Sequence, residues 1–249
     1  MDKVQQKNIT RRFKRTHDSL REISIETGIL LNADGSCMVK FGNTHVICSA
    51  TIEETLPHFL RNKGLGGWIT AEYGMLPRST HERVKREASS GKQSGRTQEI
   101  QRLIGRTLRA AVNLKKLGER QVLIDCDVIN ADGGTRCASI TGSYVAMYLA
   151  IAKHMGRNLI RENPIISQVA AVSCGIIASQ IMLDLDYDED SSAEVDANFV
   201  LASDGRLLEV QASAEKNPFS TDELMWMIDL SKKGVAKLFA AQNKAIMNI

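Results

Sequence analysis

The sequence predicts one mixed α/β (α+β) domain with internal pseudo-symmetry. Both halves of the chain run from strand-like segments to a helical pattern, and the halves meet near residues 157–164. A chain of 249 residues is long enough to bury one substantial core, and its segments depend on one another too closely for two independent domains. We therefore expect residues 15–249 to form a single domain. A basic N-terminal extension at residues 1–14 precedes it and is a candidate for disorder.

The first half begins with short strands. Residues 20–51 carry β-branched side chains in rough alternation, and an Asp-Gly pair supplies a turn within them. A further extended segment is predicted at residues 64–80, which begin with several glycines and contain a proline that ends any regular element. Residues 81–95 are polar and weakly periodic, which predicts an exposed, mobile loop.

Two helices are predicted on either side of a central strand. Apolar residues recur at helical spacing from Thr97 to Leu117, and a glycine follows at the expected stop. Residues 120–129 have the pattern of a strand. After a Gly-Gly turn, apolar residues at 140–151 mark a helix that ends near Gly156, and its mostly apolar surface predicts that it is buried.

The second half is predicted to contain two strand pairs and a closing helix. Residues 166–190 are expected to form a hairpin-like pair of strands, and residues 197–215 a second pair that turns at an Asp-Gly sequence. Ser220 and Glu223 form a capping box flanked by apolar residues, which predicts the start of the last helix.

Composition indicates an ordinary soluble globular protein without a membrane span. Hydrophobic residues make up 43% and charged residues 24% of the chain, and no apolar run approaches the roughly 20 residues that span a bilayer. The N-terminus lacks the apolar core of a secretory signal, and an organelle transit peptide is the weaker reading of its basic character. Five scattered cysteines argue against a disulfide framework or a zinc site and for buried free thiols in a reducing cytoplasm.

The charges are distributed unevenly. The net charge of +3 does not establish a nucleic-acid partner, but eight Arg and Lys residues crowd residues 78–106 and seven acids fall between Asp184 and Asp196. A basic segment suits a polyanionic substrate, and a separate acidic cluster suits a metal-dependent reaction. Taken alone, either cluster is better explained as a solvated loop or turn.

The turn between the central strand and the buried helix predicts an anion site. Gly134 lets the backbone approach a ligand closely, Thr135 offers a hydroxyl group, and Arg136 supplies a fork of donors. Arg96 stands at the start of the preceding helix, so the two helix starts would enclose one inorganic phosphate if they converge. The turn matches neither GxxxxGK[ST] nor GxGxxG, which disfavours a nucleotide-binding loop, while a tight turn with a surface arginine stays open.

The acidic cluster predicts a metal site. Asp184, Asp186 and Asp188 alternate, which places them on one face of an expected strand. Asp190 and Asp196 bracket a short turn that would bring them together across a hairpin. Two carboxylates beside a phosphate are suited to Mg²⁺ or Mn²⁺, although spacing alone does not choose among the acids.

Five motifs, in this order, resemble the bacterial ribonuclease PH family. The resemblance runs from about Arg15 to near the C-terminus and is carried by GGWITAEYGMLPRST, GRTQEIQRLIGRTLRAAVNLKKLGER, IDCDVINADGGTRCASITG, DLDYDEDSSAEVDAN and DGRLLEVQASAE. It implies a fold like that of domain 2 of ribosomal protein S5. It also implies a tRNA nucleotidyltransferase, that is, a phosphorolytic 3′-to-5′ exoribonuclease. Such enzymes trim the 3′ trailers of tRNA precursors and other RNA 3′ ends with inorganic phosphate and release nucleoside diphosphates.

The resemblance also implies the site residues and the assembly. Its phosphate-binding residues fall on Arg96, Gly134, Thr135 and Arg136. Its catalytic aspartates, which bind Mg²⁺ or Mn²⁺, fall on Asp190 and Asp196, and its tRNA-binding arginines on Arg78, Arg83 and Arg86. A cytoplasmic homohexamer, a trimer of dimers with no membrane association, is implied as well.

The sequence departs from the family pattern at a few places. Cys137 stands where a hydroxyl residue is expected, and the loop at residues 59–68 is one residue longer than is typical. An inactive ring subunit that only binds RNA is disfavoured, because this chain keeps both phosphate arginines and both aspartates. A small-molecule phosphotransferase would need a nucleotide loop that the sequence lacks.

Overall fold

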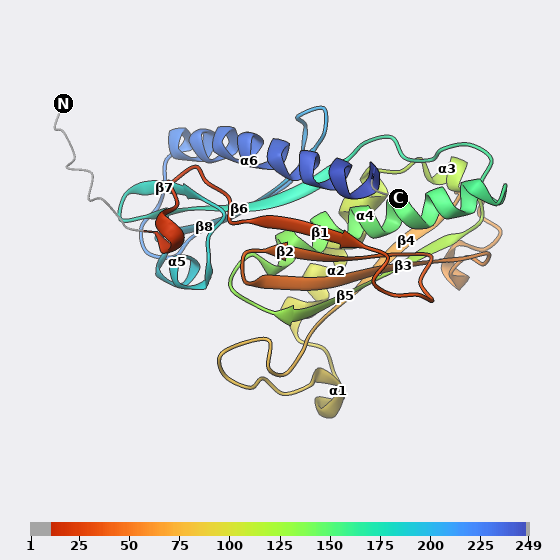
Figure 1. Ribbon diagram of the computed structural model, residues 1–249, viewed down its shortest axis with the longest axis horizontal. Helices are drawn as coiled ribbons and strands as arrows, with labels where there is room; N and C mark the ends of the chain where they lie inside the picture. The colour runs from red at the N-terminus through yellow and green to blue at the C-terminus, as the bar shows by residue number, and fades with distance from the viewer. Residues whose placement is uncertain (1–10, 248–249) are drawn as a thin grey trace.

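The computed structural model describes residues 11–247, which fold into two β-sheets and the helices that pack on them (Figure 1). The first sheet has the strand order β1-β2-β3-β5-β4. Its strands are β1 (Ile23–Thr27), β2 (Gly35–Phe41), β3 (Thr44–Glu53), β4 (Trp68–Met75) and β5 (Gln121–Asn130). Neighbouring strands are antiparallel except β4 and β5, which are parallel because α2 (Gly95–Ala110) crosses over between them.

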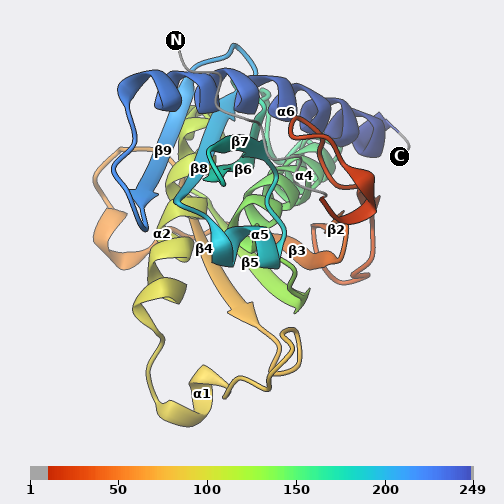
Figure 2. The same cartoon turned by 90° about the vertical axis from the view of Figure 1, so that its left-hand side faces the viewer.

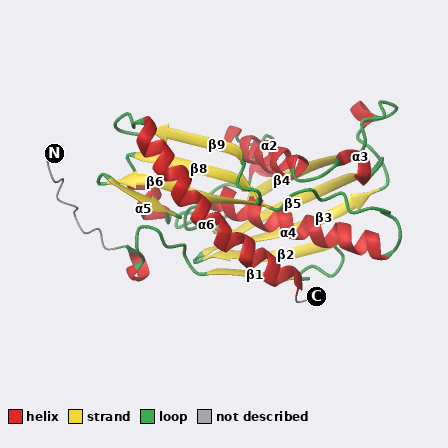
Figure 3. Ribbon diagram, turned by 90° about the horizontal axis from the view of Figure 1, so that it is seen from above, coloured by secondary structure: helices red, strands yellow, loops and turns green. Residues whose placement is uncertain are grey.

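The second sheet is antiparallel throughout and has the order β7-β6-β8-β9. Its strands are β6 (Val169–Ile177), β7 (Gln180–Leu183), β8 (Val195–Ala202) and β9 (Leu207–Ala214). A short helix, α5 (Tyr187–Ser192), connects β7 to β8. Seen from above, the two sheets lie side by side along the long axis of the molecule (Figure 3).

Helix α4 (Thr135–Gly156) joins the two halves. It packs against β2 and β3 of the first sheet and against β6 of the second, and it is buried on nearly all sides of its first three turns. Helix α6 (Thr221–Met247) lies across the top of the molecule and contacts β6, β1 and α4 (Figures 2 and 3). One cluster of buried side chains includes residues of both halves. The mixed α/β class and the buried central helix are therefore confirmed.

The first predicted helix is shorter than expected. It ends at Ala110, and a separate turn, α3 (Leu114–Leu117), follows. Between them Val112 forms a β-bridge with Ile165, and the Asn113 N–H donates to Pro164 O at 2.7 Å. The helix spacing continues through this segment, but hydrogen bonds to a distant segment replace those that would continue the helix.

The prediction of a strand through the acidic segment is wrong. Strand β7 ends at Leu183, and Asp184 adopts a left-handed turn conformation with φ of 54°. Asp186 caps α5 in a capping box with Glu189, and Asp188 lies on that helix, so the three alternating aspartates do not share a strand face. The D-x-x-E spacing is the sequence signal that identifies this helix start.

Other local predictions are confirmed. Strands β8 and β9 pair around the expected Asp-Gly turn. At the start of α6, the Ser220 N–H donates to Glu223 Oε2 at 2.7 Å and the Glu223 N–H donates to Ser220 Oγ at 3.2 Å, which completes the predicted capping box. All five cysteines are buried free thiols.

The structure describes only part of the predicted N-terminal extension. Residues 1–10 lie outside the described range. Residues 11–14 belong to the folded part, because Arg11 is buried and Arg12–Lys14 form a short 3-10 turn, η1. A second such turn, η2 (His58–Leu60), lies in the loop after β3.

The polar segment between β4 and α2 projects from the body of the molecule. It contains one short helix, α1 (Glu87–Ser90), and its residues are mostly exposed, as the sequence predicts (Figures 1 and 2). Within residues 11–247, none of the helices has the length and apolar character needed to span a bilayer.

Candidate active site

The start of α4 presents free backbone donors. Gly133 and Gly134 have φ of 75° and 65°, a conformation that glycine adopts without strain. Gly134 caps the helix and has no side chain to accept from its first N–H groups, so these groups and the positive end of the helix dipole are available to an anion. The Tyr73 hydroxyl donates to Thr135 Oγ1 at 2.9 Å, which leaves the Thr135 hydroxyl proton free to donate.

The start of α2 differs from that of α4. Ser94 caps this helix by accepting from the Thr97 N–H at 3.1 Å, so one of its backbone donors is already satisfied. The sequence suggests similar starts for these two helices, but of the two it is the start of α4 that has no side-chain cap. The guanidinium of Arg96 is exposed, and its Nη1 lies 3.7 Å from Met75 Sδ.

Arg136 is oriented by two residues from other elements. Its Nη1 donates to Gln211 Oε1 of β9 at 2.6 Å and lies 3.4 Å from Glu99 Oε1 of α2. Gln211 Nε2 donates to the same Glu99 oxygen at 2.6 Å, which closes a triangle of contacts. The Arg136 side chain is only 19% exposed, so the alternative of a tight turn with a surface arginine is wrong.

Asp190 on α5 and Asp196 on β8 form a close carboxyl pair. Burial, reinforced by the charge of Asp190, raises the pKa of Asp196 to about 6. Burial also raises the pKa of Asp190, whereas Asp196, Arg136 and Arg96 lower it. The two aspartates therefore lie close enough to affect each other's pKa, and they are carried by a helix and a strand rather than by the two strands of a hairpin.

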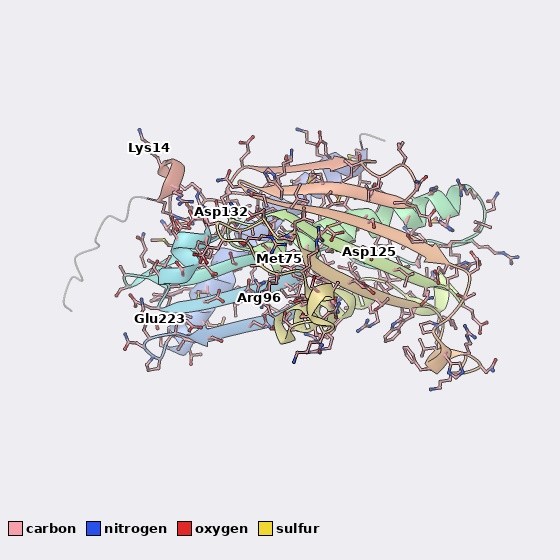
Figure 4. All side chains as sticks on the ribbon, turned by 90° about the horizontal axis from the view of Figure 1, so that it is seen from below. Lys14, Met75, Arg96, Asp125, Asp132 and Glu223 are labelled. Atoms are coloured by element: carbon pink, nitrogen blue, oxygen red, sulfur yellow. The ribbon has the colours of Figure 1, made fainter. Side chains whose placement is uncertain are left out.

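The two arginines and the two aspartates converge on one region. Arg96 and Arg136 are both close enough to Asp190 to lower the pKa of its carboxyl group. Figure 4 shows Arg96, Met75 and Asp132 near the middle of the molecule, where the first and second sheets meet. The site is thus assembled from α2, α4, α5 and β8, so it includes elements of both halves of the chain.

The carboxyl pair has an unsatisfied oxygen. Asp196 Oδ1 is buried without a hydrogen-bond partner, which is costly unless a further group binds there. Within residues 11–247, no cluster of three or more His, Cys, Asp or Glu side chains is arranged to hold a metal ion. Two carboxylates nevertheless fit Mg²⁺, because this ion is commonly bound by one or two carboxylates while waters and substrate phosphates complete its shell.

The three arginines assigned to RNA lie at different places. Arg86 lines a pocket of about 310 Å³ that also contains Arg96 and Asp127. Arg78 lines a separate pocket beside Asp132, and its Nη1 donates to His81 O at 2.9 Å. Arg83 is exposed on the projecting segment. The structure therefore brings Arg86 to the candidate site and places Arg78 beside the loop that precedes α4.

Cys137 has a hydrogen-bond partner at the position where a hydroxyl was expected. Its thiol donates to Asn198 Oδ1 at 3.3 Å, and Asn198 lies two residues after Asp196 on β8. Burial raises the pKa of Cys137, so it stays a neutral thiol. The substitution preserves a link between α4 and the strand that carries Asp196.

Sequence reasoning missed three supporting residues. Glu99 lies one helical turn after Arg96, a spacing that places both on one face of α2 and could have indicated its role. Gln211 and Tyr73 have no local signal, since each reaches the site from a strand far away in the sequence.

Comparison with known families and proteins matches both halves of the chain. Residues 19–152 match domain 1 of the 3′ exoribonuclease family, and residues 167–234 match domain 2 of the same family. The chain is 58% identical over 229 residues to proteins named ribonuclease PH from two strains of Cereibacter sphaeroides, which covers 92% of this chain and 96% of each relative.

Solved structures share the fold at low sequence identity. Rice (Oryza sativa) Rrp46 superposes with a TM-score of 0.75 at 16% identity over 93% of this chain and 98% of its own. A subunit of the Archaeoglobus fulgidus exosome, determined with RNA bound to the active site, gives a TM-score of 0.76 at 20% identity over 92% and 91% of the two chains. At these identities the comparison establishes the fold, which is the one that the motifs imply.

Proposed function

This chain belongs to the 3′ exoribonuclease family, as a member of its ribonuclease PH group, and we propose that Arg96, Arg136, Asp190 and Asp196 carry its reaction. The chain is a phosphorolytic 3′ exoribonuclease that acts in tRNA processing, with inorganic phosphate as co-substrate. The observation that supports these residue roles is the convergence of two arginines and a carboxyl pair at the open start of α4.

The start of α4 is the proposed site of the attacking phosphate. Phosphate is a poor nucleophile toward a phosphodiester, because both groups are anionic and strongly solvated. The α4 N–H groups, the Thr135 hydroxyl and the forks of Arg96 and Arg136 would replace that solvation and orient one phosphate oxygen toward the terminal phosphorus. The new P–O bond forms as the bond to the 3′ oxygen of the preceding nucleotide breaks, which releases a nucleoside diphosphate.

Asp190 and Asp196 are the proposed ligands of a divalent cation, Mg²⁺ or Mn²⁺. Such an ion supplies positive charge that stabilises the charge developing on the transferred phosphoryl group and the departing oxygen. The carboxyl pair is suited to this role because its unsatisfied buried oxygen and mutual repulsion favour a bound cation over an empty site. The nearby Arg136 and Arg96 keep more of the pair ionised.

The partners proposed for this enzyme are tRNA precursors and further copies of the chain. Arg78, Arg83 and Arg86 would contact the RNA backbone, and Arg86 and Arg96 line one pocket. The fold shared with exosome subunits is consistent with an assembly of several chains, and we propose a homohexamer, a trimer of dimers. Five buried free thiols are consistent with a cytoplasmic location.

Dependence on phosphate tests the function directly. The purified chain is incubated with RNA and Mg²⁺ in the presence or absence of phosphate, and the released nucleotides are separated. Nucleoside diphosphates are expected with phosphate, and little release is expected without it. Release of nucleoside monophosphates at equal rates under both conditions would identify a hydrolytic enzyme and refute the proposal.

Removing the basic side chains of the projecting segment should weaken RNA binding electrostatically. For Arg83→Ala combined with Arg86→Ala, tRNA affinity is expected to fall, and the slope of log K against log salt should decrease by roughly one for each RNA phosphate that the variant no longer neutralises. Lys116→Ala, which removes an exposed charge on α3 that is paired with Glu162, is the control. Identical salt slopes for the double variant, the control and the parent would place the RNA elsewhere.

A further inference from the structure

Arg21 lies where the loop before α4 meets the acidic segment. This phosphate loop comprises residues 132–134. Arg21 Nη1 donates to Asp132 O, and its Nη groups lie 3.4 Å from Gly133 O. Its Nε and Nη2 donate to the two carboxylate oxygens of Asp184 at 3.1 and 2.7 Å. Arg21 is 5% exposed and Asp184 1% exposed, so solvent scarcely screens this pair.

The side chain of Thr44, at the start of β3, forms hydrogen bonds with the same loop. Its hydroxyl donates to Gly133 O at 2.6 Å and accepts from the Asp132 N–H at 2.9 Å. The Thr44 residue is fully buried. Two buried side chains, both distant in the sequence, therefore satisfy successive backbone groups of the phosphate loop.

The loop lies directly against the start of α5. A Cβ atom at Gly133 would lie 2.6 Å from the Asp186 carbonyl carbon and 2.7 Å from Leu185 O, so this backbone contact allows only glycine. Asp186 caps α5, the helix that carries Asp190. The phosphate loop and the carboxyl pair are thus linked through one short stretch of backbone.

We propose that Arg21 and Thr44 are positioning residues that hold the phosphate loop in its binding conformation against α5. The inference rests on the proposed function, since it concerns the same phosphate. Two successive glycines make the loop flexible by itself, and ordering it on ligand binding would reduce phosphate affinity. Arg21 and Thr44 order the loop in advance without contacting the phosphate, and the Arg21–Asp184 pair fixes the loop relative to Asp190.

Arg15 provides a matched control within the same charged cluster. Its Nη1 donates to Asp184 O at 2.8 Å, and its Nη2 contacts Asp186 Oδ2 at 3.3 Å and Glu189 Oε2 at 3.0 Å. Its side chain is 6% exposed, similar to that of Arg21. Among the described residues, none of the hydrogen bonds of Arg15 goes to the phosphate loop.

The experiment measures kcat and KM for phosphate of the full-length enzyme, with RNA and Mg²⁺ present. Four variants are compared with the parent: Arg21→Lys, Arg15→Lys, Thr44→Val and Thr44→Ser. Arg21→Lys and Thr44→Val should raise KM for phosphate by about 10-fold to 100-fold, with a smaller loss of kcat at saturating phosphate. Thr44→Ser keeps the hydroxyl and should restore most of the phosphate affinity. Arg15→Lys should lower the melting temperature and leave KM for phosphate unchanged.

A second measurement does not depend on turnover. Phosphate raises the melting temperature of a protein that binds it in the folded state. The increase caused by inorganic phosphate should be smaller for Arg21→Lys and Thr44→Val than for the parent and Arg15→Lys.

The proposal is overturned if Arg21→Lys and Arg15→Lys raise KM for phosphate equally, or if Thr44→Val leaves it unchanged. If Arg21→Lys fails to fold, the comparison of Thr44→Val with Thr44→Ser decides, since both variants nearly preserve the size of the side chain. A parent enzyme without phosphate-dependent turnover would contradict the proposed function itself and is distinguishable from these results.

Discussion

Replacing Arg136 by alanine is expected to lower phosphate-dependent turnover by about 10²-fold to 10³-fold, the usual effect of removing one transition-state donor from an enclosed site. The guanidinium lies at the proposed phosphate site, and its contacts with Gln211 and Glu99 fix its orientation. Glu99 and Gln211 keep their mutual hydrogen bond in the variant, so the fold should persist. Steady-state rates are measured at saturating Mg²⁺, because Arg136 also lowers the pKa of Asp190 and Asp196.

A second variant at position 136 separates the effect of charge from that of geometry, and a variant at a distant arginine controls for nonspecific effects. Arg136→Lys retains the charge but loses the planar fork, so its activity should lie between those of the parent and Arg136→Ala. Arg206→Ala removes an exposed arginine at the β8–β9 turn and should behave as the parent. RNA binding should be nearly equal in all variants. Full phosphorolytic turnover by Arg136→Ala would refute the role assigned to this arginine.

Sequence patterns predicted elements whose signals are local. The Ser220–Glu223 capping box, the Asp-Gly hairpin and the apolar central helix were predicted because each is determined by residues within a few positions of one another. The end of α2 was not predicted. It depends on the pairing of Val112 with Ile165, more than fifty positions away, which a local pattern does not contain.

The candidate site shows the same limit. Arg96, Arg136, Asp190 and Asp196 were singled out through motifs, and the structure brings them together. Gln211 and Tyr73 were missed because each reaches the site from a distant strand, and Arg21 and Thr44 likewise contact the phosphate loop across a long sequence separation. The aspartates at 184–188 were misassigned because their alternation suggested a strand, whereas a capping box begins a helix there. The buried pairs of Arg11, Arg15 and Arg21 with Asp184, Asp186 and Glu189 make most of these acids structural.

Loss of either carboxylate of the pair should have an effect as large as the loss of Arg136. Asp196→Asn is expected to lower turnover by about 10²-fold to 10³-fold, because the pair would hold the divalent cation less tightly, and the positive charge of that cation would stabilise the transferred phosphoryl group. It should also raise the Mg²⁺ concentration needed for half-maximal rate. Binding of tRNA, for which Arg78, Arg83 and Arg86 are the proposed contacts, should be nearly unaffected.

The melting temperature of Asp196→Asn shows whether this carboxylate acts in the reaction or stabilises the fold. The folded-state pKa of Asp196 is about 6, above its ordinary value, because burial and Asp190 disfavour its charge. A carboxyl group with a raised folded-state pKa favours the folded state while it is protonated, and this contribution is lost as the pH rises through about 6. At pH 8 without metal, Asp196→Asn should therefore melt at a temperature no lower than that of the parent. Asp188→Asn, an exposed change on α5, is the control and should keep full activity. If Asp196→Asn melts well below both the parent and the control, the carboxylate contributes to the fold, and its loss of activity would then follow from unfolding.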